Sequence, residues 1–187
     1  YDELCESYKK QGVLSEDVYL EAIANTNKMA DMVESFIMDK STKYPHIYNN
    51  SEQTFKDKIN KAYKNHPYLK QRYPKKEVVK QIREEFEVYK KTGSIDFMLL
   101  ETYVREWEHA NGIQSGYGRG SVSGSLIAYV LGITQMDSKK FNLNFFRFMN
   151  PDRVTNADID TDYCSTDREK IKYFLLHDKM NLPNIKT

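Results

Sequence analysis

The sequence contains few of the residues that stabilise small or extracellular folds. Its 187 residues include two cysteines, five prolines and one tryptophan. Cys5 and Cys164 do not have the spacing of a metal site, and two such cysteines make no disulfide framework. No apolar run is long enough to cross a bilayer, and no signal peptide is visible. We therefore expect a reduced, cytoplasmic chain with no membrane partner.

The composition is that of a globular chain, 40% hydrophobic and 29% charged with a net charge of +1. The length suits one domain or part of a larger one. Because the chain begins with Tyr1 and ends in a polar stretch, residues 181–187, we expect a piece of a longer protein.

Positive charge is concentrated in the middle of the chain. Residues 51–92 contain 12 Lys and Arg against 6 Asp and Glu, whereas residues 1–50 contain 5 against 9. A basic segment of this kind can contact a nucleic-acid backbone. The alternative is a solvated face of lysine-rich helices, which is the more frequent origin of such runs.

The spacing of apolar residues predicts mainly helices. Ser15 is a candidate N-cap, followed by a helix whose apolar stripe is Val18, Ala22, Met29, Met32, Val33 and Phe36. Further helices are predicted over residues 51–64, 75–91, 97–110, 126–131 and 168–178. Residues 154–163 differ, because they alternate between polar and apolar positions and predict a strand.

Three aspartates occupy alternate positions of that expected strand: Asp158, Asp160 and Asp162. Alternate side chains of an extended segment point to one face, so the three carboxylates would stand in a row. Carboxylates so close repel one another, and a hard divalent cation such as Mg²⁺ relieves the repulsion by taking oxygen ligands. The pattern therefore favours a metal-binding edge.

A glycine-rich stretch, Gly116 to Ser125, precedes the apolar run at residues 126–131. Glycines let backbone N–H groups approach a phosphate, and a helix N-terminus offers further donors and a positive dipole end. Arg119 could neutralise phosphate charge, and Ser121 could donate a hydrogen bond or act as an N-cap. A polyphosphate site beside a metal site indicates nucleotidyl transfer.

Each motif has alternatives. Asp158, Asp160, Asp162 and Glu169 match positions 1, 3, 5 and 12 of an EF-hand loop, but Tyr163 stands where the sharp turn needs glycine. The three aspartates could also be plain surface carboxylates. The glycines could belong to a dinucleotide-binding turn with Asp137 as the ribose partner, although no second strand follows at the right distance.

The second half of the chain resembles the palm domain of bacterial C-family replicative DNA polymerases, the alpha subunits of DNA polymerase III. Three motifs carry the resemblance in the family's order: GYGRGSVSGSLIAYVLGIT, FFRFMNPDR and ADIDTDY. The resemblance implies an α+β fold, mostly helical with a small sheet, as the first part of a polymerase-beta-like nucleotidyltransferase palm. It also implies that residues 1–45 end a preceding phosphoesterase-like domain, residues 46–165 begin the palm, and residues 166–187 begin a thumb.

Matched position by position, the resemblance implies that Asp158 and Asp160 are the catalytic, metal-binding aspartates. It implies nucleotide-phosphate contacts from Arg119, Gly120, Ser121, Arg147 and Arg153, and leaves Asp162 without a defined role. The sequence departs from the family pattern at Tyr117, Phe146, Ala157 and Tyr163, where the family usually has Pro, Glu, Pro and Phe. These departures indicate a divergent, phage-like member.

The activity implied is that of a DNA-directed DNA polymerase, which adds deoxynucleotides to a primer 3′-end with two Mg²⁺ ions. The implied partners are primer-template DNA, deoxynucleoside triphosphates, and a sliding clamp and other replisome proteins bound through parts outside this chain. A third catalytic aspartate is expected beyond residue 187, so this chain alone is expected to be inactive. The alternative from another class is a non-catalytic module that binds nucleotides or nucleic acid.

Overall fold

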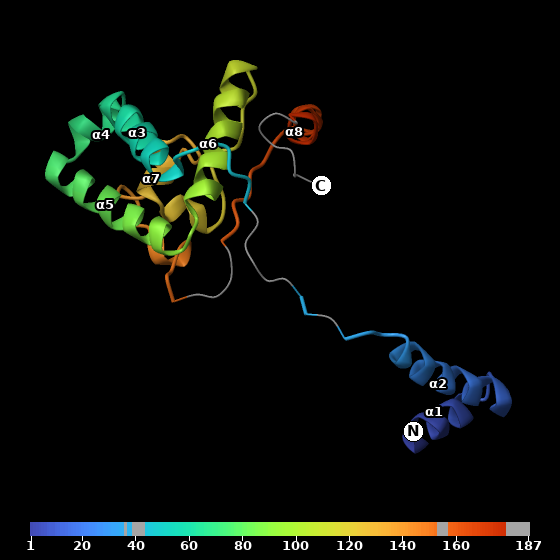
Figure 1. Ribbon diagram of the computed structural model, residues 1–187. Coiled ribbons are helices and arrows are strands. Elements are labelled where there is room, and N and C mark those ends of the chain that lie inside the picture. Colours follow the sequence, from blue (N-terminus) through green and yellow to red (C-terminus); the bar gives the residue numbers. More distant parts are fainter. Residues whose placement is uncertain (36, 39–43, 153–156, 179–187) are drawn as a thin grey trace. The chain divides into compact units, whose positions relative to one another are not determined.

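A computed structural model describes residues 1–35, 37–38, 44–152 and 157–178 (Figure 1). The chain divides into two units, Tyr1–Thr42 and Lys43–Thr187. Each unit has its own helices and its own buried residues. None of the described helices is both long and apolar enough to span a membrane.

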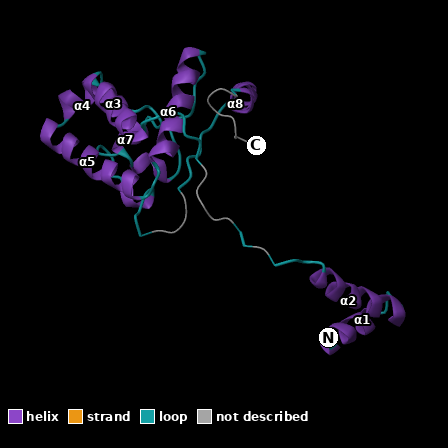
Figure 2. Ribbon diagram, in the orientation of Figure 1, coloured by secondary structure: helices purple, strands orange, loops and turns teal. Residues whose placement is uncertain are grey.

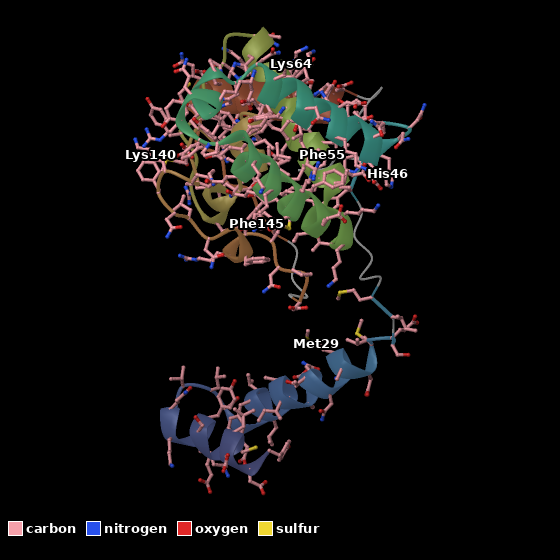
Figure 3. All side chains as sticks on the ribbon, turned by 90° about the vertical axis from the view of Figure 1, so that its left-hand side faces the viewer. Met29, His46, Phe55, Lys64, Lys140 and Phe145 are labelled. Atoms are coloured by element: carbon pink, nitrogen blue, oxygen red, sulfur yellow. The ribbon has the colours of Figure 1, made fainter. Side chains whose placement is uncertain are left out.

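The smaller unit is a pair of helices, α1 (Asp2–Gln11) and α2 (Glu16–Asp31). The predicted start of α2 is confirmed, since Ser15 is its N-cap. The predicted apolar stripe is wrong: α2 buries Tyr19 and Ile23, and the Tyr19 ring stacks on Tyr8 of α1 at a centroid distance of 5.6 Å. Stripe members Val18, Met29 (labelled in Figure 3), Met32 and Val33 are exposed, and Phe36 lies outside the described residues.

The larger unit is built from six α-helices and two short 3-10 helices among its described residues. The helices predicted at 51–64, 75–91 and 97–110 are confirmed to within two residues. Pro67 begins a short helix that the apolar spacing did not predict. The bounds are α3 (Ser51–Lys64), α4 (Pro67–Arg72), α5 (Lys75–Lys91), α6 (Ile95–Ala110), η1 (Ser121–Gly124), α7 (Leu126–Val130), η2 (Phe145–Arg147) and α8 (Ser165–His177).

Aromatic side chains hold the centre of the larger unit together. Phe55 of α3 is fully buried and contacts Phe86 and Tyr89 of α5, each at a centroid distance of 5.8 Å (Figure 3). Tyr89 also packs edge-on against Phe145, the first residue of η2, and against Phe148, its C-cap. Helices far apart in the sequence therefore share one core.

The predicted α+β fold with a small sheet is wrong for the residues that the structure describes, which contain helices and loops and no strand (Figure 2). Residues 157–164 carry no helix or strand. A strand requires a ladder of repeated backbone bonds to a neighbour. Here one such bond is found, from the Gly116 N–H to the Asp162 carbonyl oxygen at 2.9 Å, and it does not continue into a ladder.

The helix predicted at residues 126–131 is confirmed to within one residue, and a 3-10 helix that was not predicted precedes it. The segment begins with η1, turns at Ser125 and continues as the five-residue α7. At the other end of the unit, α8 packs on α6 through Trp107 and Phe174, whose rings stack at 4.2 Å. The segment predicted to begin a thumb is thus joined to the helical body by an aromatic contact.

We expect Phe55→Ala to lower the free energy of unfolding by about 3–5 kcal/mol, because it leaves a cavity among the rings of the core. Phe141→Ala is the matched control, since Phe141 is 51% exposed and its loss should change stability by no more than about 0.5 kcal/mol. Urea denaturation of both variants measures the difference. Equal effects would contradict a core centred on Phe55.

Candidate functional site

The aspartate segment keeps the two-residue alternation expected from the sequence, although it is not a strand. Asp158, Asp160 and Asp162 are exposed, whereas the residues between them are half-buried. Ala157 and Ile159 pack against the main core. The apolar positions therefore hold the segment on the helical body and leave the carboxylates facing solvent.

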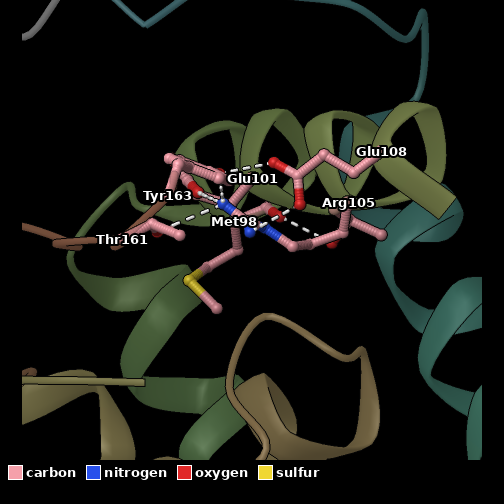
Figure 4. A network of polar contacts seen from close by, with 7 residues as sticks. Met98, Glu101, Arg105, Glu108, Thr161 and Tyr163 are labelled. Carbon is pink, nitrogen blue, oxygen red and sulfur yellow. Dashed lines mark hydrogen bonds and ion pairs between the residues drawn. The ribbon is translucent and has the colours of Figure 1, made fainter. Parts of the chain in front are cut away.

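A buried polar network on α6 fixes the second half of this segment (Figure 4). Arg105 is 3% exposed and donates hydrogen bonds to Glu108 at 2.7 Å, to the Thr161 hydroxyl at 3.1 Å and to the Tyr163 hydroxyl. The Tyr163 hydroxyl in turn donates to Glu108. Thr161 and Tyr163 alternate with the aspartates, so this network determines which way Asp160 and Asp162 point.

Glu101, one turn before Arg105 on α6, lies 3.8 Å from the guanidinium. Burial raises the pKa of Glu101 to about 7, and the charge of Arg105 only partly opposes this shift. One guanidinium faces two carboxylates, and Glu108 makes the closer contact. Glu101 therefore still carries a proton in about half of the folded molecules near pH 7, where an ordinary glutamate is ionised.

The glycine loop meets the aspartate segment at two points. The Gly116 N–H binds the Asp162 carbonyl oxygen, and a Cβ built at Gly116 would lie 3.3 Å from the Cβ of Asp162. The Arg119 guanidinium lies 3.0 Å from the Asp162 carboxylate and 3.6 Å from that of Asp160. The hydrogen bond to Asp162 and both negative charges raise the pKa of Arg119 further above its usual value. The structure thus brings together two motifs about forty residues apart.

Two glycines of the loop are required for different reasons. A side chain at Gly118 would overlap the Thr134 hydroxyl, which donates to the Tyr117 carbonyl oxygen. Gly120 has open space around it but adopts φ 72° and ψ −160°, a conformation that is essentially restricted to glycine. The loop can therefore bring its backbone close to a ligand at Gly120.

The first turn of α7 does not offer free donors. Its Leu126 and Ile127 N–H groups donate to the Glu85 carboxylate, each at 2.9 Å, and the Ala128 N–H donates to the Ser125 hydroxyl. The expectation that this helix start binds phosphate is therefore not met by its geometry. A phosphate would have to be bound by the loop upstream of Ser125.

The sequence pattern did not single out Glu85 or the buried polar network on α6. Glu85 stands among charged residues in the sequence, yet it is 1% exposed. A usable signal was present: Val78, Glu85 and Tyr89 fall on one face at helical spacing, so a carboxylate sits within an apolar stripe. Arg105 and Glu108 fall on the buried side of α6 in the same way.

The other predicted site residues are more dispersed. Ser121 is half-buried, and its hydroxyl has no hydrogen bond to the described residues. Arg147, implied as a phosphate contact, is exposed on η2 and forms no ion pair with the described part of the chain, whereas Arg119 pairs with the aspartates. Arg153 lies outside the described residues.

The alternative motifs find no support in the geometry. The Asp137 carboxylate, considered as a ribose partner, accepts hydrogen bonds from the Tyr73 hydroxyl and from the backbone of Lys139 and Lys140. Within the described ranges, no group of three or more His, Cys, Asp or Glu side chains is arranged to hold a metal ion, and this finding covers both the EF-hand positions and the expected row of three aspartates. What the geometry defines is a glycine loop facing exposed carboxylates on a helical body.

Comparison with known proteins shows which family this chain belongs to. Residues 27–177 match the family described as "Bacterial DNA polymerase III alpha NTPase domain", and the chain belongs to this family. It is 35% identical to the DNA polymerase III subunit alpha of Halalkalibacterium halodurans over 156 residues, which are 82% of this chain and 14% of that protein.

Two further relatives carry the same name. The subunit from Staphylococcus aureus strain MRSA252 is 42% identical over 105 residues, 53% of this chain and 10% of that protein. The subunit from Aquifex aeolicus is 43% identical over 96 residues, 51% of this chain and 8% of that protein. The chain therefore spans about a seventh or less of the length of these relatives.

The raised pKa of Glu101 predicts that stability falls as the pH rises. The folded chain keeps this proton between the ordinary pKa of 4.5 and about 7, whereas the unfolded chain releases it, so the free energy of unfolding decreases across that window. The free energy of unfolding of Glu101→Gln should equal that of the wild type at about pH 5. It should exceed the wild-type value by about 1–3 kcal/mol at about pH 8.

Denaturant titrations at both pH values measure this difference. Glu106→Gln is the matched control, because Glu106 lies on the same helix, is exposed and pairs with Lys58. A Glu101→Gln advantage that is equal at the two pH values would mean that Glu101 is already ionised in the folded chain at acidic pH.

Proposed function

We propose that this chain is the first part of the palm of a C-family replicative DNA polymerase, whose parent adds deoxynucleotides to a primer 3′-end. In this proposal residues 1–45 end a preceding domain, residues 46–165 form the palm and residues 166–187 begin the thumb. The observation that carries it is the meeting of the glycine loop and the aspartate segment, through Arg119 and Gly116, in a member of this family.

The donor chemistry at the aspartate segment fits Mg²⁺. Asp158 and Asp160 are exposed carboxylates two residues apart, held from behind by half-buried neighbours, and hard cations prefer such oxygen ligands. We propose these two residues as the metal ligands that this chain supplies. Two bound Mg²⁺ ions would activate the primer hydroxyl and stabilise the leaving pyrophosphate.

The chain's own residues would position the triphosphate. Gly120 allows close approach of the backbone, and the Ser121 hydroxyl has no competing partner among the described residues. Arg119 and Arg147 are exposed cations that can turn toward phosphate oxygens, and Arg153 is proposed to join them. Arg119 must then move away from Asp160. Before the substrate binds, Arg119 neutralises the charge of this proposed metal ligand; after binding, it neutralises the charge of a phosphate.

The basic segment offers a surface for primer-template DNA. Lys61, Lys64, Lys70 and Arg83 are exposed on α3, α4 and α5, while Lys56 and Lys90 both pair with Glu52. Part of the excess charge is therefore neutralised within the chain and part is free to meet phosphates. A sliding clamp and other replisome proteins would bind through parts of the parent beyond this chain.

In the parent polymerase, Asp158→Asn or Asp160→Asn should abolish primer extension while leaving the fold intact, because exposed carboxylates contribute little to packing. Ser121→Ala should reduce extension less, since it removes one phosphate hydrogen bond among several. Primer extension on gels, with circular dichroism as the folding control, measures both effects. Parental activity in a well-folded Asp160→Asn enzyme would favour the non-catalytic binding module instead.

The isolated chain should bind Mg²⁺ weakly, because it supplies two carboxylates of a shell that substrate phosphates and a further ligand would complete. Mn²⁺ should bind more tightly, and Asp158→Asn/Asp160→Asn should remove the signal in calorimetry. The chain alone should not extend a primer, since the 3′-hydroxyl is not held in line. Tight Mg²⁺ binding, or nucleotide incorporation by these 187 residues, would contradict an incomplete site.

A further inference from the structure

The Glu85 carboxylate lies where α5 meets the end of the glycine loop. Both of its oxygens are saturated: Oε1 accepts from the Leu126 N–H at 2.9 Å and from the Gln81 amide at 3.0 Å. Oε2 accepts from the Ser125 hydroxyl at 2.8 Å and from the Ile127 N–H at 2.9 Å. The buried Glu85 carboxylate thus accepts four hydrogen bonds. One comes from its own helix, and three come from residues about forty positions later in the chain.

Ser125 extends this arrangement into the core. Because its hydroxyl donates to Glu85, the fully buried Tyr89 hydroxyl donates to it at 2.7 Å, as does the Ala128 N–H at 3.0 Å. Every polar atom in this set then has a partner, and the direction of each hydrogen bond follows from the carboxylate being an acceptor only. The position of Ser125 is determined from both sides.

The loop residues proposed to bind phosphate are linked to Ser125 through η1. The Ser125 N–H donates to the Val122 carbonyl oxygen at 3.0 Å. This bond joins Ser125, the C-cap of η1, to the residue that follows Ser121. On its outer side η1 is held by Gly124, where any Cβ would lie 2.7 Å from the Asn144 carbonyl oxygen. A displacement of Ser125 would therefore be passed to η1, which begins at Ser121 next to Gly120, because at Gly124 the backbone has no free space on the side of Asn144.

We propose that Glu85 is a positioning residue for nucleotide binding: by fixing Ser125 and the first turn of α7, it sets the position from which Gly120 and Ser121 contact the triphosphate. This inference rests on the proposed function of the loop. Glu85 also occupies the donors of α7, so the phosphate is directed to the loop and away from the helix end.

Glu85→Gln is the sharpest variant because it keeps the size of the side chain. Its NH₂ group must replace one of the two oxygens, and in either orientation it faces a backbone N–H, that of Leu126 or of Ile127. One donor in the first turn of α7 then loses its partner and the turn shifts. Glu84→Gln is the matched control, since Glu84 is the adjacent residue, is exposed and pairs only loosely with Lys80 at 3.8 Å.

The experiment uses the full-length polymerase on a primer-template. Glu85→Gln should raise the KM for the correct deoxynucleotide by about tenfold or more, lower kcat by less than about fivefold, and leave primer-template affinity unchanged. The dissociation constant of the same nucleotide should rise equally in a complex with a dideoxy-terminated primer, where no chemistry occurs. Glu84→Gln should behave as the wild type in every assay.

Ser125→Ala provides a second variant that keeps the Glu85 charge and should raise the same dissociation constant; it decides the matter if Glu85→Gln does not fold. Unchanged nucleotide affinity in the folded variants would overturn the proposal. So would a loss of kcat, nucleotide affinity and DNA affinity in equal proportion, which is the signature of a smaller folded fraction. If the wild-type complex with the dideoxy-terminated primer bound no nucleotide, the proposed function itself would fail, and this outcome is distinct from an effect confined to Glu85.

Discussion

The glycine loop is held in place by a buried negative charge. The carboxylate of Glu85 has no solvent to stabilise it, so its stability depends on the donors that surround it. Burial raises its pKa, and hydrogen bonds from the Ile127 and Leu126 N–H groups oppose that shift. These contacts join α5, α7 and the loop into one body, because leaving any of the donors unpaired would cost free energy in the apolar core.

The aspartate segment solves a related problem without a sheet. An exposed row of carboxylates needs a backbone that does not twist away, and here the support comes from side chains: Ile159 packs against the core, and Thr161 and Tyr163 bind Arg105. Tyr163 stands where the resembling family usually has Phe, and its hydroxyl joins Arg105 to Glu108. The departure therefore adds a polar anchor close to Asp162.

Local patterns predicted the helices and the facing of the aspartates well, because hydrophobic spacing reports directly on which side of a segment is buried. They wrongly predicted a strand where the described residues contain none, since pairing depends on partners that a local pattern does not contain. They also missed Glu85 and Arg105, because a charged residue in an apolar stripe is ambiguous until its partners are known. The apolar stripe predicted in and after α2 failed for a similar reason: Met29 and Val33 have helical spacing, but none of the described residues buries them.

In the function proposed above, Arg119 is the side chain that connects the metal ligands to the nucleotide. Its guanidinium lies between the loop and the carboxylates, and all three side chains are more than half exposed, so solvent screens the pairing and it contributes little to stability. A weak pairing is easily exchanged: a cation at Asp160 would repel Arg119, and a triphosphate at the loop would attract it. The rigid contacts of Glu85 and Arg105 keep the two backbones in place during that exchange, so one flexible side chain can respond while the distance between the loop and the aspartates is preserved.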